Sequence, residues 1–588
     1  MAYIDRINRK LRREFGGRVR AAESDGCLVL EGELEDWADV VRAGTLAAEK
    51  PSFRGRRQYR GLVNRVRFTG GEIPPMRTPA LRDASLEGAR PDVLVIGAGI
   101  CGCAIARELA RYDLDILLAD KEHDVALHAS SRNDGMVHPG IDLRKGSRKH
   151  HYNLRGNALY DRITGELGVP FERTGQYLCF GSPLFKPILF LSLLYWKWLG
   201  LKGVRVIGGK ELRRREPGLR EDLSAALFFP SAGIVCPYGL TIAYGENAVQ
   251  NGVRLSPDTA VLGMTLEGGR IIRVETNRGR IYPAVVVNAA GVFAAEVADM
   301  AGDRFYTIHP RRGTNAILDK KAAPLLVRTI VSKLGSSSRT AHTKGGGMVK
   351  TVHGNLLVGP DAVETFEGEN FATCRGSLEA TFAKFATVSP GLSPGQIITY
   401  FTGVRAPTYE EDFVVCKGVK TGNLVHVAGI QSPGLTAAPA IAQDAARFAA
   451  ELLEAAGRPV GANSRFDPRR IPIPHVAALP AAERQALIRQ NPDYGIILCR
   501  CEEVSRGEIL DSLRRPVPCD TLDGVKRRVR PGMGRCQGGF CGPLVLQLIA
   551  REKGLSVEEV TKAGPGSFVL WGPAKAAAPE PEEAPHAG

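Results

Sequence analysis

Long hydrophobic runs are absent from this 588-residue chain. No stretch reaches the roughly 18 uninterrupted apolar residues of a membrane-spanning helix, so we expect no such helix. A secretory signal is not expected either, because the stretch from Met1 to Arg20 carries charges throughout. Basic residues form no run with interleaved aromatics, so we expect no nucleic-acid partner. We therefore expect a cytoplasmic protein, or one bound peripherally to the inner face of the membrane.

The chain also lacks the cysteine pattern of a disulfide framework. It has 12 cysteines in 588 residues, and several of them pair at short spacings. These pairs are Cys101 and Cys103, Cys499 and Cys501, and Cys536 and Cys541. Such spacing is typical of a reducing compartment and of metal ligation. The net charge of +15 favours anionic partners such as anionic substrates or lipid headgroups, and a diffusely basic surface without a ligand is the alternative.

Residues 93–102 carry a dinucleotide-binding fingerprint. Four apolar residues run into Gly97, Gly99 and Gly102, a helix-compatible segment follows, and a second apolar run ends in Asp120. In such a pattern the first glycine permits a tight turn, the second lets the backbone approach a pyrophosphate, and the third lets helix and strand pack closely. Asp120 stands where an acidic residue holds a ribose hydroxyl. By itself this motif leaves NAD and FAD equally open.

Residues 1–75 are predicted to form a small α/β unit in front of this motif. The expected elements are helices over residues 4–15 and 35–48 and strands over residues 27–33 and 61–68. This pattern resembles BON-type domains, small modules linked to phospholipid or partner contact, and a docking module without a ligand is the alternative. Residues 71–90 contain three prolines and are predicted to be a linker.

The segment from Ser130 to Ile141 reads S-S-R-N-D-G-M-V-H-P-G-I. It resembles the segment that lies along the flavin in the glycine/D-amino-acid-oxidase superfamily, which includes FAD-dependent glycerol-3-phosphate dehydrogenases and L-2-hydroxyglutarate oxidases. This chain departs at Asp134, where serine is more frequent, and at Asp142, where tyrosine or arginine is common. The resemblance implies FAD as a resident cofactor and an α/β fold. That fold is a Rossmann-like FAD-binding domain interleaved with an antiparallel-sheet substrate domain, over residues 91–455.

The same resemblance implies roles for individual residues. His138 corresponds to a base that takes the substrate's hydroxyl proton, and a structural histidine beside the flavin is the alternative. Arg405 corresponds to an arginine that clamps the anionic end of the substrate, which suits its planar fork. Ala406 replaces the proline that usually follows, and a surface ion pair is the alternative for Arg405. The residues implied in FAD binding are Gly97, Gly99, Gly102, Asp120, Ser130, Ser131, Asn133, Val261, Gly291, Gly429, Gly434, Leu435 and Thr436.

Residues 183–199 form an apolar stretch in which only Lys186 and Lys197 are charged. The stretch is too short to span a bilayer. We expect a core helix here. The alternative is an interfacial patch that anchors the protein on a membrane, with its aromatic residues at the depth of the headgroups.

Residues 494–553 are predicted to be a small helical C-terminal domain with four cysteines in C-x-C and C-x4-C spacing. Four thiolates from two glycine-flanked loops can hold a [2Fe–2S] cluster, and zinc is the alternative. The run G-M-G-R-C-Q-G-G-F-C resembles the ferredoxin-like domain named after bacterioferritin-associated ferredoxin, which implies the cluster. Its ligands are Cys499, Cys501, Cys536 and Cys541, and Cys519 is left over. Residues 575–588 are expected to be a disordered tail.

A flavin and an iron–sulfur cluster in one chain imply two-electron oxidation followed by export of single electrons. We therefore predict an FAD-dependent dehydrogenase, because an oxidase that reduces O₂ directly would not need the cluster. The resemblance favours sn-glycerol 3-phosphate, oxidised to dihydroxyacetone phosphate, with an electron-accepting protein subunit or a quinone as partner. The alternatives are an L-2-hydroxy acid such as 2-hydroxyglutarate, an amino acid, and a non-catalytic electron-transfer subunit.

Overall fold

The computed structural model describes residues 2–48, 58–326, 330–333, 346–573 and 575. The chain divides into two compact units, Met1–Pro472 and Ile473–Gly588. The predicted disordered tail lies outside the described residues, apart from Lys575.

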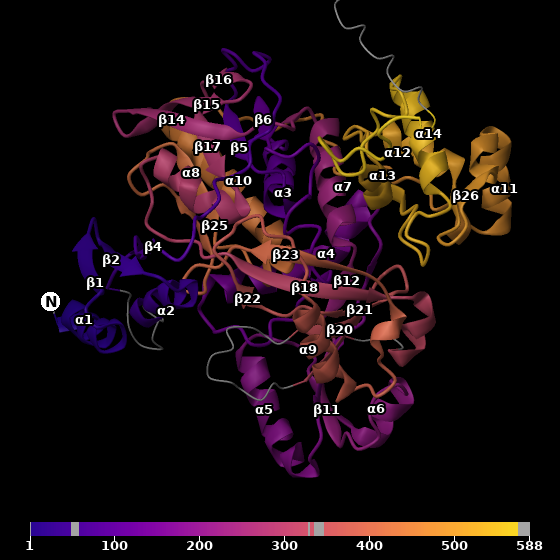
Figure 1. Cartoon of the computed structure of the whole chain (residues 1–588), viewed down its shortest axis with the longest axis horizontal. Coiled ribbons are helices and arrows are strands. Elements are labelled where there is room, and N and C mark those ends of the chain that lie inside the picture. Colours follow the sequence, from indigo (N-terminus) through magenta and orange to yellow (C-terminus); the bar gives the residue numbers. More distant parts are fainter. Residues whose placement is uncertain (1, 49–57, 327–329, 334–345, 574, 576–588) are drawn as a thin grey trace, which may run out of the picture. The chain divides into compact units, whose positions relative to one another are not determined.

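The first unit contains a six-stranded sheet, which lies in its upper part in Figure 1. In spatial order its strands are β13 (Arg254–Ser256), β6 (Ile116–Ala119), β5 (Val93–Ile96), β17 (Val285–Asn288), β25 (Leu424–Ala428) and β24 (Val414–Lys417). All neighbours run parallel except β24, which is antiparallel to β25. The strands β5, β6 and β17 are buried at every residue, as expected for a parallel sheet with both faces covered. The Rossmann-like expectation is confirmed.

Four helices pack against one another, and the first and last of them also pack against this sheet. Three of them start at the cavity described below. They are α3 (Ile100–Leu109), α4 (Arg148–Leu167), α7 (Pro237–Gln250) and α10 (Gly434–Ala455). The helix α10 buries a row of alanines along its length. Its start lies so close to α4 that a Cβ on Gly156 would be 2.0 Å from the carbonyl oxygen of Thr436.

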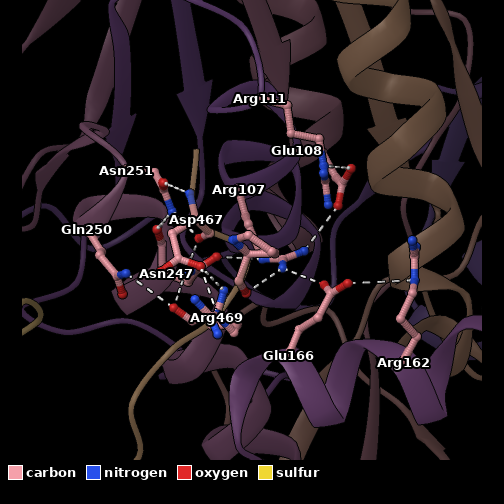
Figure 2. Close-up of polar contacts among 11 residues, drawn as sticks. Arg107, Glu108, Arg111, Arg162, Glu166, Asn247, Gln250, Asn251, Asp467 and Arg469 are labelled. Carbon is pink, nitrogen blue, oxygen red and sulfur yellow. Dashed lines mark hydrogen bonds and ion pairs between the residues drawn. The ribbon is translucent and has the colours of Figure 1, made fainter. Parts of the chain in front are cut away.

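The far end of α3 is fixed by a fully buried arginine, Arg107 (Figure 2). Its Nε donates to Asn247 on α7 at 2.7 Å, and a terminal nitrogen donates to Glu166 on α4 at 2.7 Å. The same terminal nitrogen donates to the carbonyl oxygen of Pro468 at 3.0 Å. This one side chain therefore ties three helices and the segment after α10 together.

A second, mainly antiparallel sheet provides the other wall of the site. Within the described residues its strands are β10 (Arg205–Gly208), β11 (Ala225–Phe229), β9 (Gln176–Phe180), β19 (Ile330–Lys333), β20 (Gly347–Lys350), β21 (Leu356–Gly359), β18 (Arg311–Leu318) and β22 (Val363–Glu364), with β23 (Ile397–Arg405) also paired to β18. Helix α9 (Arg375–Ala386) packs against β18 and β21. Because these strands interleave in sequence with the Rossmann elements, the predicted fold class is confirmed.

Shorter elements complete the first unit. They are β7 (Met136–Val137), β8 (Phe171–Glu172), β12 (Gly233–Val235), β14 (Val261–Glu267), β15 (Arg270–Thr276), β16 (Gly279–Ile281), α6 (Gly209–Arg215) and α8 (Ala294–Met300). β7, β12 and β8 form one small sheet, and β14, β15 and β16 form another.

The N-terminal segment folds as α1 (Ala2–Phe15), β1 (Val19–Ser24), β2 (Cys27–Leu34), α2 (Trp37–Ala47), β3 (Leu62–Asn64) and β4 (Arg67–Phe68). Strand β1 was not expected, because its sequence does not alternate regularly. This segment shares a core with the FAD-type fold, since Tyr409 packs among its apolar residues. The Tyr409 hydroxyl accepts a hydrogen bond from the Asn64 side chain at 3.0 Å, and Glu410 accepts one from the Leu62 backbone at 2.8 Å.

Helix α5 (Lys186–Trp198) contradicts the expectation of a core helix. Leu189 is the only buried residue of this helix. The sequence could not show which side faces the core, because apolar residues occur on every side of the helix. Among the described residues, no helix is long and apolar enough to cross a membrane.

The second unit is small and helical. Its elements are α11 (Ala481–Gln490), β26 (Ile497–Cys499), β27 (Val504–Ser505), α12 (Arg506–Leu513), α13 (Leu522–Val529) and α14 (Gly542–Lys553). Helix α12 starts with a capping box in which Ser505 and Glu508 each bind the other's backbone N–H. Cys499 and Cys541 lie in its core.

Candidate active site

A cavity of about 360 Å³ opens at the carboxyl ends of β5, β6 and β17 and reaches the antiparallel sheet. The structure brings most of the predicted site residues to its wall. They are Gly97, Gly99, Asp120, Ser130, Asn133, His138, Val261, Gly291, Arg405, Gly434 and Leu435. The two departures from the superfamily pattern, Asp134 and Asp142, line it as well. A ligand site at the carboxyl edge of a parallel sheet is the usual arrangement in this fold class.

The glycine fingerprint has the geometry that a dinucleotide needs. Gly97 has φ +104°, and a Cβ there would lie 2.5 Å from the carbonyl oxygen of Ala289. A Cβ on Gly102 would lie 1.7 Å from the carbonyl oxygen of Gly97. Helix α3 can therefore begin directly against the strand end only because both residues are glycine. Its N-terminus, with the positive end of the helix dipole, borders the cavity, where it can bind phosphate.

Asp120 follows β6 and borders the cavity. Its carboxylate accepts hydrogen bonds from the backbone N–H groups of Ala98 and Glu122. Burial raises the pKa of Asp120, although these two hydrogen bonds oppose the shift. The carboxylate thus fixes the glycine turn to the second strand at the position expected for a ribose contact.

Four predicted residues lie outside the cavity wall. Gly102 serves helix packing, and Gly429, at φ +69°, forms a turn with no room for a Cβ. The Ser131 hydroxyl donates to the carbonyl oxygen of His128 at 3.2 Å. The Thr436 hydroxyl accepts the backbone N–H of His138 at 2.7 Å. These four residues support the cavity wall through packing and hydrogen bonds but do not line the cavity.

His138 is buried, lines the cavity and is held firmly in place. Its carbonyl oxygen accepts side-chain hydrogen bonds from Asn153 at 3.3 Å and from Asn157 at 3.0 Å, both on α4. The ring Nδ1 accepts the backbone N–H of Gly140 at 3.3 Å. Because that bond is long, it contributes little to choosing the ring tautomer.

Arg405 ends β23, and its guanidinium donates to the carbonyl oxygen of Asp361 at 2.7 Å. Among the described residues no carboxylate forms an ion pair with it, which argues against the surface ion-pair alternative. Burial and the nearby Arg311 lower the pKa of Arg405, but a guanidinium remains protonated at neutral pH. Gly313 leaves the room for this side chain, since a Cβ there would lie 1.9 Å from its terminal nitrogen. A half-buried guanidinium that lines the cavity is suited to bind an anion.

Arg311 was missed by sequence reasoning. The register of β18 and β23 places it opposite Arg405. It is buried and neutralised by Glu364 and by Glu411, the latter at 2.9 Å. Glu411 also binds Lys149 at 3.5 Å. Burial opposes the ionisation of Glu411, but Lys149 and Arg311 outweigh it and lower the pKa to about 2. This network is charge-balanced in itself, and Arg405 takes no part in its ion pairs among the described residues.

The network also connects the cavity to the N-terminal module. His309 Nδ1 lies 2.9 Å from a carboxylate oxygen of Glu364. The His309 ring stacks on the Tyr409 ring with 4.5 Å between the ring centroids. Tyr409 belongs to the core of that module. The loop that carries Tyr409 and Glu411 therefore packs against the N-terminal module.

Asn315 is a second cavity residue that no motif marks. It lies on β18, is 1% exposed, and neither polar atom of its amide has a hydrogen-bond partner among the described residues. Buried amides are nearly always paired, because an unmade hydrogen bond costs free energy. A polar ligand in the cavity would satisfy this amide.

An acidic cluster at the cavity rim holds a cation of the chain itself. Glu122, His128 and Glu369 have ligand atoms within 4.8 Å of one another. The Lys121 ammonium lies 2.6 Å from both carboxylates. The cluster is thus already neutralised, and we assign no metal to it.

In the second unit the four predicted cysteines gather as two pairs. The sulfur atoms of Cys501 and Cys536 lie 3.6 Å apart, and Cys499 shares a thiol hydrogen bond with Cys541. No three of these sulfurs fall within 4.8 Å of one another among the described residues. A tetrahedral zinc would require all four within about 3.8 Å of each other. Two pairs instead fit a cluster with two iron atoms.

The surroundings favour the thiolate form of one cysteine in each pair, Cys499 and Cys536, whereas the pKa values of their partners Cys541 and Cys501 are raised. The hydrogen bond from Cys541, together with backbone N–H groups of Gly532 and Glu502, lowers the pKa of Cys499 to about 6 against the effect of burial. Backbone hydrogen bonds from Phe540 and Gly538 lower the pKa of Cys536. N–H groups that point at sulfur are a common feature of iron–sulfur sites. Cys519 donates to the carbonyl oxygen of Ser512 instead.

Two family models match the chain. Residues 92–448 match FAD dependent oxidoreductase, and residues 497–551 match the BFD-like [2Fe-2S] binding domain. These matches confirm the resemblances to the D-amino-acid-oxidase superfamily and to the ferredoxin-like domain, and the BON-type resemblance of residues 1–75 stays a prediction.

Several known proteins are similar to the chain over most of their length. A glycerol 3-phosphate dehydrogenase of Caloramator mitchellensis is 36% identical over 82% of this chain and 99% of its own. A glycerol 3-phosphate oxidase of Mycoplasma pneumoniae is 26% identical over 61% of this chain and 94% of its own. The FAD-bound structure of L-alpha-glycerophosphate oxidase from Mycoplasma pneumoniae superposes with a TM-score of 0.59 at 24% identity, over 65% of this chain and 98% of that one. This last likeness shows the shared fold.

Proposed function

We propose that this chain, which belongs to the FAD-dependent oxidoreductase family, oxidises sn-glycerol 3-phosphate to dihydroxyacetone phosphate. The observation that carries the proposal is the pairing of His138 with Arg405 in one cavity, where Arg405 is a half-buried cation without a carboxylate ion-pair partner among the described residues. The 36%-identical glycerol 3-phosphate dehydrogenase supports the choice of substrate.

The roles of the chain's own residues follow from their positions. Arg405 binds the phosphate, since its fork can donate two parallel hydrogen bonds to neighbouring oxygens. Asn315 offers its amide to a polar group of the bound ligand. His138 accepts the proton of the substrate's secondary hydroxyl, a role suited to imidazole at neutral pH. To accept at Nε2, the neutral ring must carry its hydrogen on Nδ1, which requires the 3.3 Å contact with Gly140 to open.

Both cofactors match the residues present. When bound, FAD supplies the acceptor for the hydride from the substrate carbon, and the [2Fe–2S] cluster supplies single-electron storage. The cavity provides the glycine turn, the N-terminus of α3 and an amide left unpaired by the described residues. The four ligands proposed for the cluster are Cys499, Cys501, Cys536 and Cys541.

We further propose that the electrons leave to a protein subunit or a quinone, and that the protein works in the cytoplasm with peripheral contact to the inner face of the membrane. A dedicated one-electron domain supports the first part. The exposed helix α5 supports the second.

Replacement of Arg405 by leucine is expected to lower kcat/KM for glycerol 3-phosphate about 100-fold, because the buried hydrogen bonds to the anion are lost. Lysine keeps the charge without the planar fork, so Arg405→Lys should lose about tenfold. Steady-state kinetics with an artificial acceptor measure both.

The matched control is Arg312→Leu, since Arg312 lies on the neighbouring strand, outside the cavity wall, and binds Asn370 at 3.2 Å. Its kcat/KM should stay within about twofold of the wild type. An Arg405→Leu enzyme with unchanged kcat/KM and reduced stability would assign the arginine a structural role only.

Asn315→Leu should stabilise the free protein and weaken substrate use at the same time. Leucine removes two buried polar atoms that lack partners among the described residues, which is worth about 1 kcal/mol in the free energy of unfolding. The same change removes a ligand hydrogen bond and should raise KM about tenfold. Thermal unfolding without ligand and steady-state kinetics give the two readouts. A less stable variant with an unchanged KM would contradict this role.

A panel of substrates tests the proposed function. Under anaerobic conditions, glycerol 3-phosphate should bleach the flavin absorbance faster than L-2-hydroxyglutarate, an amino acid or unphosphorylated glycerol. Absence of bleaching by every member of the panel would favour the electron-transfer alternative.

A further inference from the structure

Helix α5 and the turn before it form an exposed apolar surface. Eight large apolar side chains of this segment are exposed, and Leu184, Leu191 and Leu194 are 83%, 69% and 71% exposed. The eight are Leu184, Phe185, Ile188, Phe190, Leu191, Leu194, Tyr195 and Trp198. A contiguous apolar patch of this kind marks an interaction site on a soluble fold.

The helix is anchored on its inner face only. Leu189 is buried and packs with Leu227 and Phe229 of β11. Trp196 meets the Phe229 ring edge-on at 5.2 Å, and its indole N–H donates to Ser192 at 3.2 Å. These contacts fix α5 on the antiparallel sheet and turn the eight apolar side chains outward. Figure 1 shows α5 beside β11, at the lower end of the first unit.

The chain segment that carries this patch has charge of one sign. Residues 173–210 contain no aspartate and no glutamate, and they carry six basic residues. These are Arg173, Lys186, Lys197, Lys202, Arg205 and Lys210. Lysines stand near both ends of the helix, and a further one, Lys145, lies 4.0 Å from the Trp198 ring and donates to the Trp198 carbonyl oxygen at 2.7 Å.

We infer that α5 docks the protein on an anionic lipid surface, with the helix axis in the plane of the membrane. A helix of 13 residues is about 20 Å long, which is short of the about 30 Å hydrocarbon core. Apolar side chains, aromatic rings and flanking lysines without acids are the combination that an interface between headgroups and acyl chains attracts. A free amphipathic helix exposes a polar face to water. In α5 the corresponding face packs against the rest of the protein instead.

This geometry favours a lipid surface over another protein. The apolar side chains project from a convex helix, which a fluid acyl layer can surround without a complementary pocket. The basic residues match the negative potential of a cytoplasmic leaflet. Docking through α5 specifies the peripheral membrane contact proposed above and rests on that proposal. It depends on neither the substrate nor the residues of the cavity, so its test is independent of the proposed reaction.

The test uses the full chain with both cofactors and two kinds of vesicle, phosphatidylcholine alone and an equal mixture with phosphatidylglycerol. In flotation, binding to the anionic vesicles should be at least tenfold stronger than to the neutral ones and should weaken with salt. Leu191→Ser/Leu194→Ser should lower it at least tenfold. Lys186→Gln/Lys197→Gln should lower it about fivefold for each charge removed.

Leu262→Ser/Ile272→Ser is the matched control, because it changes two exposed apolar residues of the β14–β15 pair and should leave binding unchanged. Anaerobic flavin reduction by glycerol 3-phosphate should be the same in all three variants and the wild type. Brominated acyl chains should quench tryptophan emission in the wild type and less in Trp198→Phe.

Two results would overturn the inference. One is equal, weak flotation of the wild type and Leu191→Ser/Leu194→Ser with anionic vesicles. The other is a wild-type dimer in sedimentation that the same double variant converts to a monomer while vesicle binding stays unchanged, which would assign the patch to a second copy of the chain.

Discussion

Replacement of His138 by glutamine is expected to slow the anaerobic reduction of the flavin by glycerol 3-phosphate by a factor of about 100 to 10,000. Glutamine keeps the polarity and much of the volume of histidine but accepts no proton at neutral pH. The backbone hydrogen bonds of this position, to Thr436 and from Asn153 and Asn157, do not depend on the side chain. FAD content should therefore stay near that of the wild type. Stopped-flow absorbance, normalised to bound flavin, measures the rate.

His150→Gln is the control for this variant. His150 is also a buried histidine, but it contacts the carbonyl oxygen of Leu199 at 2.8 Å and lies outside the cavity wall. Its reduction rate should stay within about threefold of the wild type. Loss of FAD from His138→Gln with an unchanged rate per bound flavin would replace the proposed base by a structural histidine.

Replacement of Arg107 by methionine is expected to lower the free energy of unfolding of the first unit by about 3–5 kcal/mol. Methionine is similar in length but leaves Glu166 and Asn247 without their 2.7 Å partner in a buried setting (Figure 2). The guanidinium also lies over the rings of Tyr244 and Phe466, at 6.0 and 5.7 Å, so packing is lost as well. Chemical denaturation measures the change.

Arg111→Met provides the comparison, since Arg111 follows closely after the same helix and is paired with Glu108 at 2.8 Å, but its side chain is 36% exposed. Exposed pairs of this kind are worth about 0–1 kcal/mol. Equal, small effects of the two substitutions would show that α3 does not depend on the buried arginine. A large effect of Arg107→Met should also weaken FAD retention, because α3 begins at the cavity.

The part of the site that faces the cofactor was predictable because short contiguous motifs encode it. The run from Gly97 to Gly102 fixes its own turn, since the close approaches to the Ala289 and Gly97 carbonyl oxygens exclude any side chain. The stretch that carries Ser130, Asn133 and His138 likewise reaches the cavity as one segment.

Arg311 and Asn315 could not be predicted, because neither lies in a recognisable motif. They reach the cavity through the register of β18 against β23, which pairs Arg311 with Arg405. Such a register between distant strands is determined by packing over the whole sheet. Residues 183–199 were predicted to be helical, but the sequence did not show which side of α5 packs against β11 and which side is exposed. The packing of Tyr409 into the N-terminal module also joins segments that are far apart in the sequence, so no local pattern predicts it.

The most direct test of the account is anaerobic mixing of the full chain with glycerol 3-phosphate, followed by absorbance and then by low-temperature EPR of frozen samples. We expect rapid bleaching of the flavin and the appearance of a reduced [2Fe–2S] signal from electrons of the substrate alone. Bleaching by a carboxylate or amine substrate but not by glycerol 3-phosphate would contradict the proposed substrate. Flavin bleaching without any cluster signal would contradict the proposed path of the electrons.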